Sequence, residues 1–333
     1  MQPKLIFVVG VWRSGTSLLH ALLHNHPQIA LMYEAEPFGL FPCKADHIFP
    51  NDWTTRLEFF NQTFSRHRLD QAAQLKNRPA RECALALFRA WAKGKNATVM
   101  GDKSPSYHRY LPEISRLFPE ADFIVIWRDP LDTCRSVMNA GKQNRFFSRK
   151  EILPQAFFGG EQLARGVLQL RAAKRRVHEV VYPELVGDPE GELRKICDFI
   201  GLEFDARMLD LTTADYSMLP PGAHHLLARS GAVKREWGRR EVLPEKFIAK
   251  GQRYAVAWRE RYSELAFARA LPVLTDASQP GFLETWLDSN TYRACWSLTH
   301  LKHLVTRRMP IPIWQRLRSL AKPPKIENSL NCD

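Results

Sequence analysis

The most informative stretch of the chain is a candidate anion-binding turn near its N-terminus. The apolar run at 4–9 predicts a buried strand, and apolar periodicity predicts a helix over 17–24. The turn between them has the spacing Gly10-x4-Gly15-x-Ser17. In a strand–turn–helix unit, backbone N–H groups and the positive end of the helix dipole point into the turn. The stretch therefore predicts a site for a phosphate-like group.

The cation of this turn is not where a nucleoside-triphosphate loop has it. Such a loop carries a lysine directly before its Ser or Thr, and here that position is Thr16. The positive charge stands inside the turn, at Arg13. Arginine stays protonated and presents a planar fork of donors to an oxyanion. We therefore expect an anion that is held differently from ATP in an ATPase.

A second candidate phosphate motif follows a later strand. The apolar run at 122–127 is followed by Arg128, and Ser136 lies eight residues further on, in a helical pattern. A guanidinium and a hydroxyl placed in this way are suitable donors for another phosphate. A third stretch, 180–189, places Tyr182 directly after another apolar run.

Taken together, these stretches resemble the sulfotransferases that use 3′-phosphoadenosine-5′-phosphosulfate (PAPS). The turn that contains Arg13 is similar to the family's 5′-phosphosulfate loop, with the Arg-Ser-Gly-Thr sequence of a carbohydrate or tyrosylprotein-like branch. Arg128 and Ser136 match its 3′-phosphate motif. Tyr182 lies in a stretch similar to the Tyr-Glu-Asp-Leu segment near the adenine, from which it departs at Pro183. The resemblance spans roughly residues 4–240.

The resemblance implies PAPS-binding residues at both ends of the nucleotide. They are Arg13, Ser14, Gly15, Thr16 and Ser17 at the 5′-phosphate and sulfonate, Tyr182 near the adenine, and Arg128, Ser136, Lys234 and Arg235 at the 3′-phosphate, the last two in a late loop.

Two carboxylates and a lysine complete the predicted active site. Arg13 is expected to stabilise the charge on the bridging oxygen and the sulfonate of PAPS. Glu34 and Glu36 follow the apolar run 29–32, and Glu34 lies 21 residues after Arg13. The tyrosylprotein sulfotransferases have a catalytic glutamate at about this distance, so the resemblance implies that Glu34 is the general base. Glu36 is expected to contact the acceptor or to substitute for Glu34. Lys103 lies in a Lys-Ser-Pro stretch similar to that of carbohydrate sulfotransferases and is expected to reach the sulfonate.

Strand and helix patterns alternate along the chain. This alternation predicts an α/β fold with a P-loop-like central parallel sheet, flanked by helices and connected by right-handed crossovers. Ligands of such sheets bind beyond the carboxyl ends of the strands, which is where both phosphate motifs fall. The expected strands are 4–9, 29–32, 97–100, 122–127 and 177–182.

Two regions are expected along the chain. Residues 1–245 form the PAPS-dependent sulfotransferase domain, and residues 246–333 form a helical, basic C-terminal extension docked on it. The extension is expected to begin with one long amphipathic helix over 247–271. The segment 291–320 mixes large apolar residues with Arg and Lys. Peripheral contact of this segment with an anionic membrane is therefore the alternative to docking.

Composition narrows the partners and the location. Among 333 residues, 48 are Lys or Arg and 35 are acidic, which gives a net charge of +13 and favours anionic partners. No nucleic-acid recognition motif is evident. No apolar run of about 18 residues and no secretory leader is visible, so we expect a cytoplasmic protein, with membrane-peripheral contact as the open alternative. The six cysteines lack close pairs, which indicates reduced thiols and no bound metal.

The sequence thus predicts transfer of a sulfonate group from PAPS to a hydroxyl of an acceptor. A glycan or glycolipid is the expected acceptor, attacked in line with a glutamate as general base and without a metal. Two alternatives remain at this point. One is a small-molecule kinase of the P-loop type, and the other is a non-catalytic nucleotide-binding module.

Overall fold

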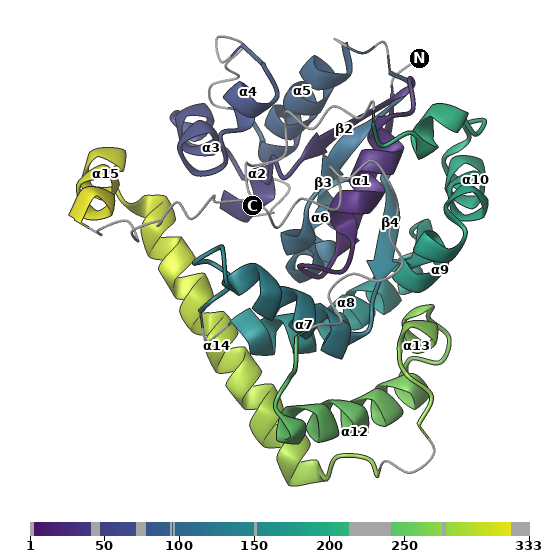
Figure 1. The fold of residues 1–333 in the computed structure, drawn as a ribbon. Helices are drawn as coiled ribbons and strands as arrows, with labels where there is room; N and C mark the ends of the chain where they lie inside the picture. Colours follow the sequence, from purple (N-terminus) through teal and green to yellow (C-terminus); the bar gives the residue numbers. More distant parts are fainter. Residues whose placement is uncertain are drawn as a thin grey trace, which may run out of the picture.

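The structure, a computed structural model, describes residues 3–40, 47–70, 78–93, 95, 97–149, 152–212, 241–274 and 278–320. Its centre is a sheet of five parallel strands in the order β2-β3-β1-β4-β5 (Figure 1). The predicted α/β class is therefore confirmed. The strands are β1 Lys4–Gly10, β2 Ile29–Tyr33, β3 Val99–Lys103, β4 Asp122–Trp127 and β5 Val177–Val181.

Helices cover both faces of the sheet, which explains why its strands are apolar runs and not alternating patterns. Along β1, Ile6 and Val8 point into one layer of the core, and Phe7 and Val9 point into the other. The first layer contains α1 (Thr16–His24), α9 (Tyr182–Gly187) and α10 (Pro189–Ile200). The second contains α5 (Ala80–Lys93), α6 (Leu111–Leu117), α7 (Pro130–Gly141) and α8 (Ile152–Ala172).

Short helical segments surround the carboxyl edge of β2 and β3 and the end of α10. They include two turns of 3-10 helix, which follow β3 and α10. These segments are α2 (Pro37–Leu40), α3 (Trp53–Asn61), α4 (Thr63–Arg66), η1 (Pro105–Arg109) and η2 (Ala206–Leu209).

The C-terminal part of the chain is helical, but its first helix is shorter than predicted. In place of one helix over 247–271, the structure has α12 and α13, because the chain turns after Arg261. This turn lets Phe267 reach the ring of Trp127, 5.0 Å away, in the main core. The helices of this part are α12 (Glu245–Arg261), α13 (Phe267–Ala270), α14 (Phe282–Arg308) and α15 (Ile311–Leu320).

Helix α14 runs along the outside of the molecule from α12 towards α15 (Figure 1). It contacts α8 through Tyr292, whose ring lies 5.7 Å from that of Phe158 and whose hydroxyl donates to Gln162. Within the part of the chain that the structure describes, no helix combines the length and apolarity needed to span a bilayer.

Candidate active site

The turn between β1 and α1 has the shape of an anion-binding loop. Gly15 caps α1 with a positive φ of 108°, and no side chain caps the first helical amides. These amides have no acceptor within the helix. A Cβ atom on Gly15 would lie 2.3 Å from the ring of Tyr182, and one on Gly10 would lie 2.5 Å from Ser14 Oγ. Both positions therefore require glycine, and the helix dipole points into the turn.

Ser14 provides a direct test of whether this turn suits a phosphate. Its Oγ is buried and has no hydrogen-bond partner among the described residues. A buried hydroxyl without a partner carries a free-energy cost that a bound oxyanion would remove. The uncapped amides and this hydroxyl together fit the 5′-phosphate group that the family resemblance implies.

Two arginines and a serine lie close to the turn. Arg13 Nε donates to Ser136 Oγ on α7 at 3.2 Å, and Arg128 donates to the carbonyl oxygen of Arg13 at 3.1 Å. The Arg128 guanidinium also lies over the ring of Tyr182, 4.5 Å from its centroid. Burial, assisted by the neighbouring Arg128, lowers the pKa of Arg13. Two neighbouring guanidinium groups in a partly buried site favour an anionic ligand between them.

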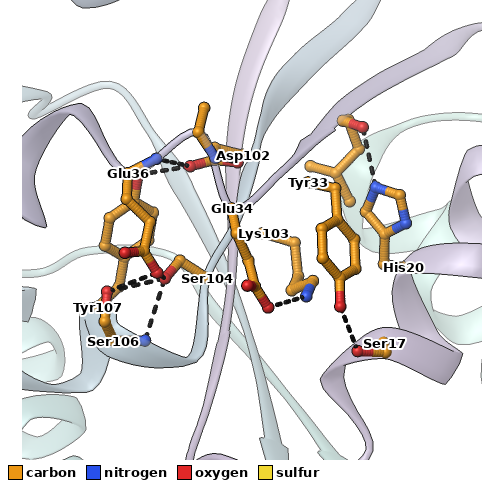
Figure 2. A network of polar contacts seen from close by, with 12 residues as sticks. Ser17, His20, Tyr33, Glu34, Glu36, Asp102, Lys103, Ser104, Ser106 and Tyr107 are labelled. Carbon is orange, nitrogen blue, oxygen red and sulfur yellow. Dashed lines mark hydrogen bonds and ion pairs between the residues drawn. The ribbon is translucent and has the colours of Figure 1, made fainter. Parts of the chain in front are cut away.

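Glu34 and Lys103 form an ion pair at the carboxyl ends of β2 and β3. Lys103 Nζ lies 2.7 Å from Glu34 Oε1 and 3.3 Å from the ring centroid of Tyr33 (Figure 2). The lysine side chain is 0% exposed, whereas that of Glu34 is 30% exposed. Burial lowers the pKa of Lys103, while Glu34 opposes this effect. The glutamate is thus the member of the pair that solvent or a substrate reaches.

Tyr33 connects this pair to the phosphate-binding turn. Its hydroxyl lies 2.8 Å from Ser17 Oγ in the first turn of α1 (Figure 2). Its backbone N–H donates to His67 Nε2 at 2.9 Å, and His67 Nδ1 lies 2.8 Å from the carbonyl oxygen of Thr63. This pattern requires neutral His67 with its proton on Nδ1. Consistent with this, burial lowers the pKa of His67 to about 4.

Glu36 is held more tightly than Glu34. Its carboxylate accepts from Ser106 Oγ at 2.9 Å and from Ser104 Oγ. Burial, followed by the charge of Glu34, raises the pKa of Glu36. Both glutamates have positive φ angles, 51° for Glu34 and 48° for Glu36. Such angles are uncommon for residues other than glycine and mark a loop whose conformation is imposed by its surroundings.

Asp102 imposes that conformation. It is fully buried, and its carboxylate accepts from the amides of Ala35 and Glu36, at 3.2 and 3.1 Å, and from the Tyr107 hydroxyl at 2.5 Å. Burial raises the pKa of Asp102 to about 7. The loop that carries both glutamates is therefore held in place by one carboxyl group (Figure 2).

The structure brings most of the predicted site residues together. Sequence reasoning missed Tyr33, Asp102 and Ser104, although all three flank predicted residues. The sequence indicates these residues only as polar side chains at the ends of apolar strands. Which of them contact one another follows only from the register of the strands. Lys234 and Arg235 lie outside the described residues, and among the described residues no group of three or more His, Cys, Asp or Glu has a metal-binding arrangement.

Comparisons with known proteins agree with this geometry. The model of the sulfotransferase family matches residues 3–206. The omega-hydroxy-beta-dihydromenaquinone-9 sulfotransferase Stf3 of Mycobacterium tuberculosis is 26% identical over 293 residues, covering 70% of this chain and 73% of its own. Protein-tyrosine sulfotransferase 2 of Gallus gallus is 25% identical over 212 residues, covering 62% of this chain and 54% of its own.

A solved structure supports the fold independently. The sulfotransferase domain of the Synechococcus PCC 7002 olefin synthase superposes with a TM-score of 0.53 at 24% identity, covering 73% of this chain and 90% of that domain. The family match covers more than half of the chain and includes the 5′ turn, Glu34, Lys103 and the 3′ motif. The chain therefore belongs to the sulfotransferase family, and it is a sulfotransferase enzyme of the PAPS-dependent kind.

Proposed function

We propose that this sulfotransferase moves the sulfonate of PAPS to a hydroxyl group of a glycan or glycolipid. The observation that supports it most is the convergence of Arg13, Arg128 and Ser136 with the Glu34–Lys103 pair at one edge of the sheet. Cations for a doubly phosphorylated nucleotide and a carboxylate for a hydroxyl proton are the two requirements of this reaction.

Donor binding is assigned to the two motifs. The amides from Ser14 to Ser17 and the Ser14 hydroxyl bind the 5′-phosphate, and Arg128 and Ser136 bind the 3′-phosphate. Arg13, which lies in the turn and donates to Ser136, stabilises the negative charge that develops on the bridging oxygen of PAPS. Because arginine does not release a proton in proteins, Arg13 acts by its charge alone. PAPS itself supplies the activated sulfonate.

Glu34 is the proposed general base. The acceptor oxygen forms a bond to sulfur while the bond from sulfur to the bridging oxygen breaks, and that oxygen keeps the electron pair. The hydroxyl proton passes to a carboxylate oxygen of Glu34, whose Oε1 lies 2.7 Å from Lys103 Nζ. Glu36 is less suited, because the hydroxyls of Ser104 and Ser106 already donate to its Oε1. We assign Glu36 to contact with the acceptor.

The acceptor proposal rests on the Lys-Ser-Pro sequence at Lys103, which is similar to that of carbohydrate sulfotransferases. The names of the relatives refer to a tyrosine and to a hydroxylated menaquinone, so the family accepts more than one hydroxyl class. Radiolabelled PAPS offered to glycans, glycolipids, phenols and peptides, with mass analysis of products, tests the proposal. Label on a glycan or glycolipid supports it. Label only on phenols or peptides contradicts the acceptor class, and no transfer to any acceptor contradicts the reaction.

The kinase alternative is disfavoured by the phosphate turn. Thr16 stands where a kinase of this type needs lysine. The hydroxyl of Ser17, which would face a metal-bound nucleotide in such a kinase, is instead hydrogen-bonded to Tyr33. Calorimetry that compares adenosine 3′,5′-bisphosphate with ATP and magnesium distinguishes the two, because a kinase would bind the second ligand at least as tightly.

A further inference from the structure

Helix α14 packs on the protein with its polar side. Arg253 on α12 lies 2.6 Å from Glu284, and the Tyr254 hydroxyl donates to Asp288 at 2.8 Å. Lys250 forms a further ion pair with Asp288. The charged residues at the start of α14 thus face the neighbouring helix and not the solvent.

The opposite side of the same helical segment is apolar and faces outward. Phe282, Leu283, Trp286 and Leu287 are each between 50% and 87% exposed. At 3.6 residues per turn they lie within an arc of about 140°, and the exposed Val305 lies on the same side further along the helix. This orientation is the reverse of a helix that packs on its own core. Four large apolar side chains exposed side by side in this way mark a site of interaction.

The charge of the adjoining sequence identifies the partner. From Ser289 to Ile326 there is no acidic residue. Arg293 falls within the same arc of the helix as the apolar residues and is exposed. The stretch carries six cations within α14 and α15, at Arg293, Lys302, Arg307, Arg308, Arg316 and Arg318.

We propose that α14 and α15 bind the surface of an anionic phospholipid membrane. The apolar side of α14 enters the boundary between headgroups and acyl chains, while the exposed Arg293 and Arg316 contact the lipid phosphates. A second copy of the chain would also cover apolar residues, but it would bring two basic segments together, which their like charges oppose. The helix lies along the membrane for about 40 Å, given 1.5 Å per residue over its 27 residues.

Sedimentation of the full chain with vesicles tests this proposal. We expect binding to phosphatidylcholine vesicles that contain phosphatidylglycerol, at least about tenfold weaker binding to phosphatidylcholine alone, and loss of the difference at high salt. The double substitution Phe282→Ser and Trp286→Ser should weaken the partition about 100-fold. Val242→Ser, an equally exposed apolar position outside α14, is the matched control and should bind as the wild type does.

A second measurement does not depend on loss of binding. Brominated phospholipids should quench the tryptophan fluorescence of the wild type more than that of Trp286→Phe, which keeps an apolar ring at this position. Equal quenching, or equal binding of the double variant and the wild type, would overturn the proposal. So would a dimer in light scattering that the double variant dissociates, because a second copy would then occupy the surface. Binding of adenosine 3′,5′-bisphosphate, measured in parallel, should not change, so this test is separate from that of the proposed reaction.

Discussion

The substitution Glu34→Gln separates the chemical step from donor binding. A glutamine has the shape of glutamate but cannot accept the acceptor proton. General-base catalysis contributes about 10²- to 10⁴-fold to the rate, so turnover should fall by at least 10²-fold, which corresponds to about 2.7 kcal/mol in the barrier. Glu34 does not contact Arg128 or Ser136 in the hydrogen bonds described above. Affinity for adenosine 3′,5′-bisphosphate should therefore stay within about threefold of the wild type.

The same contacts predict a small effect on stability. Lys103 is fully buried and loses a charged partner at 2.7 Å, but the amide oxygen of the introduced glutamine still accepts its hydrogen bond, and the Tyr33 ring remains below it. The difference between a charged and a neutral acceptor is about 1 kcal/mol, and the 30% exposure of Glu34 reduces it further. We expect a Tm lower by about 2 °C. Loss of activity in this variant thus cannot be attributed to unfolding.

The assay is single-turnover transfer from radiolabelled PAPS to the acceptor identified in the panel. Glu36→Gln is the matched control, because Glu36 lies in the same loop with a similar positive φ. It should affect the acceptor KM more than the rate of the chemical step. Near-wild-type turnover of Glu34→Gln would refute the assignment of the base. A large loss in Glu36→Gln alone would transfer that role to Glu36.

Three further predictions follow from particular contacts. Gly15→Ala forces a Cβ atom into the Tyr182 ring and should abolish the binding of adenosine 3′,5′-bisphosphate in calorimetry. Gly187→Ala is the control, because its added Cβ meets nothing within 4 Å, and it should bind as the wild type does. Equal binding by the two variants would contradict the shape of the turn. In Asp102→Asn, one buried backbone amide of the loop that carries Glu34 and Glu36 faces an NH₂ group and loses its acceptor. Thermal unfolding should show a free energy of unfolding that is lower by about 1–3 kcal/mol. His67 has a pKa of about 4, below its usual 6.5, so the unfolded state binds the proton more readily and stability is lost as pH falls from 6.5 to 4. In His67→Gln the free energy of unfolding should fall by about 1.4 kcal/mol less per pH unit over this range than in the wild type. Parallel curves of unfolding free energy against pH for the two proteins would contradict this prediction.

The parallel sheet could be predicted because its strands are buried on both faces and read as apolar runs. The juxtaposition of the two phosphate motifs could also be predicted. Both follow strands of a parallel sheet, whose carboxyl ends share one edge. In the structure β1 and β4 are neighbours, with Gly10 opposite Ile126. Three residues beyond Gly10 and two beyond Ile126, Arg13 and Arg128 are in contact.

The details of the catalytic loop could not be predicted, because they depend on strand register. Tyr33 lies opposite Lys103 in the sheet, and this pairing places the lysine against Glu34. No local pattern in either strand specifies the pairing. The turn after Arg261 was missed for a related reason. The local periodicity continues through it, and only the distant contact of Phe267 with Trp127 favours the break. The roles of Lys234 and Arg235 stay predictions.

The central claim is that the turn with Arg13 binds the 5′ end of PAPS and that Arg128 binds its 3′-phosphate. Calorimetry with adenosine 3′,5′-bisphosphate and adenosine 5′-monophosphate, on the wild type and on Arg128→Ala, tests it most directly, with the exposed Arg116→Ala as control. The wild type should prefer the bisphosphate by about 100-fold, and Arg128→Ala should remove this preference while binding the monophosphate as before. If Arg128→Ala keeps the full preference for the bisphosphate, the 3′-phosphate does not bind at Arg128.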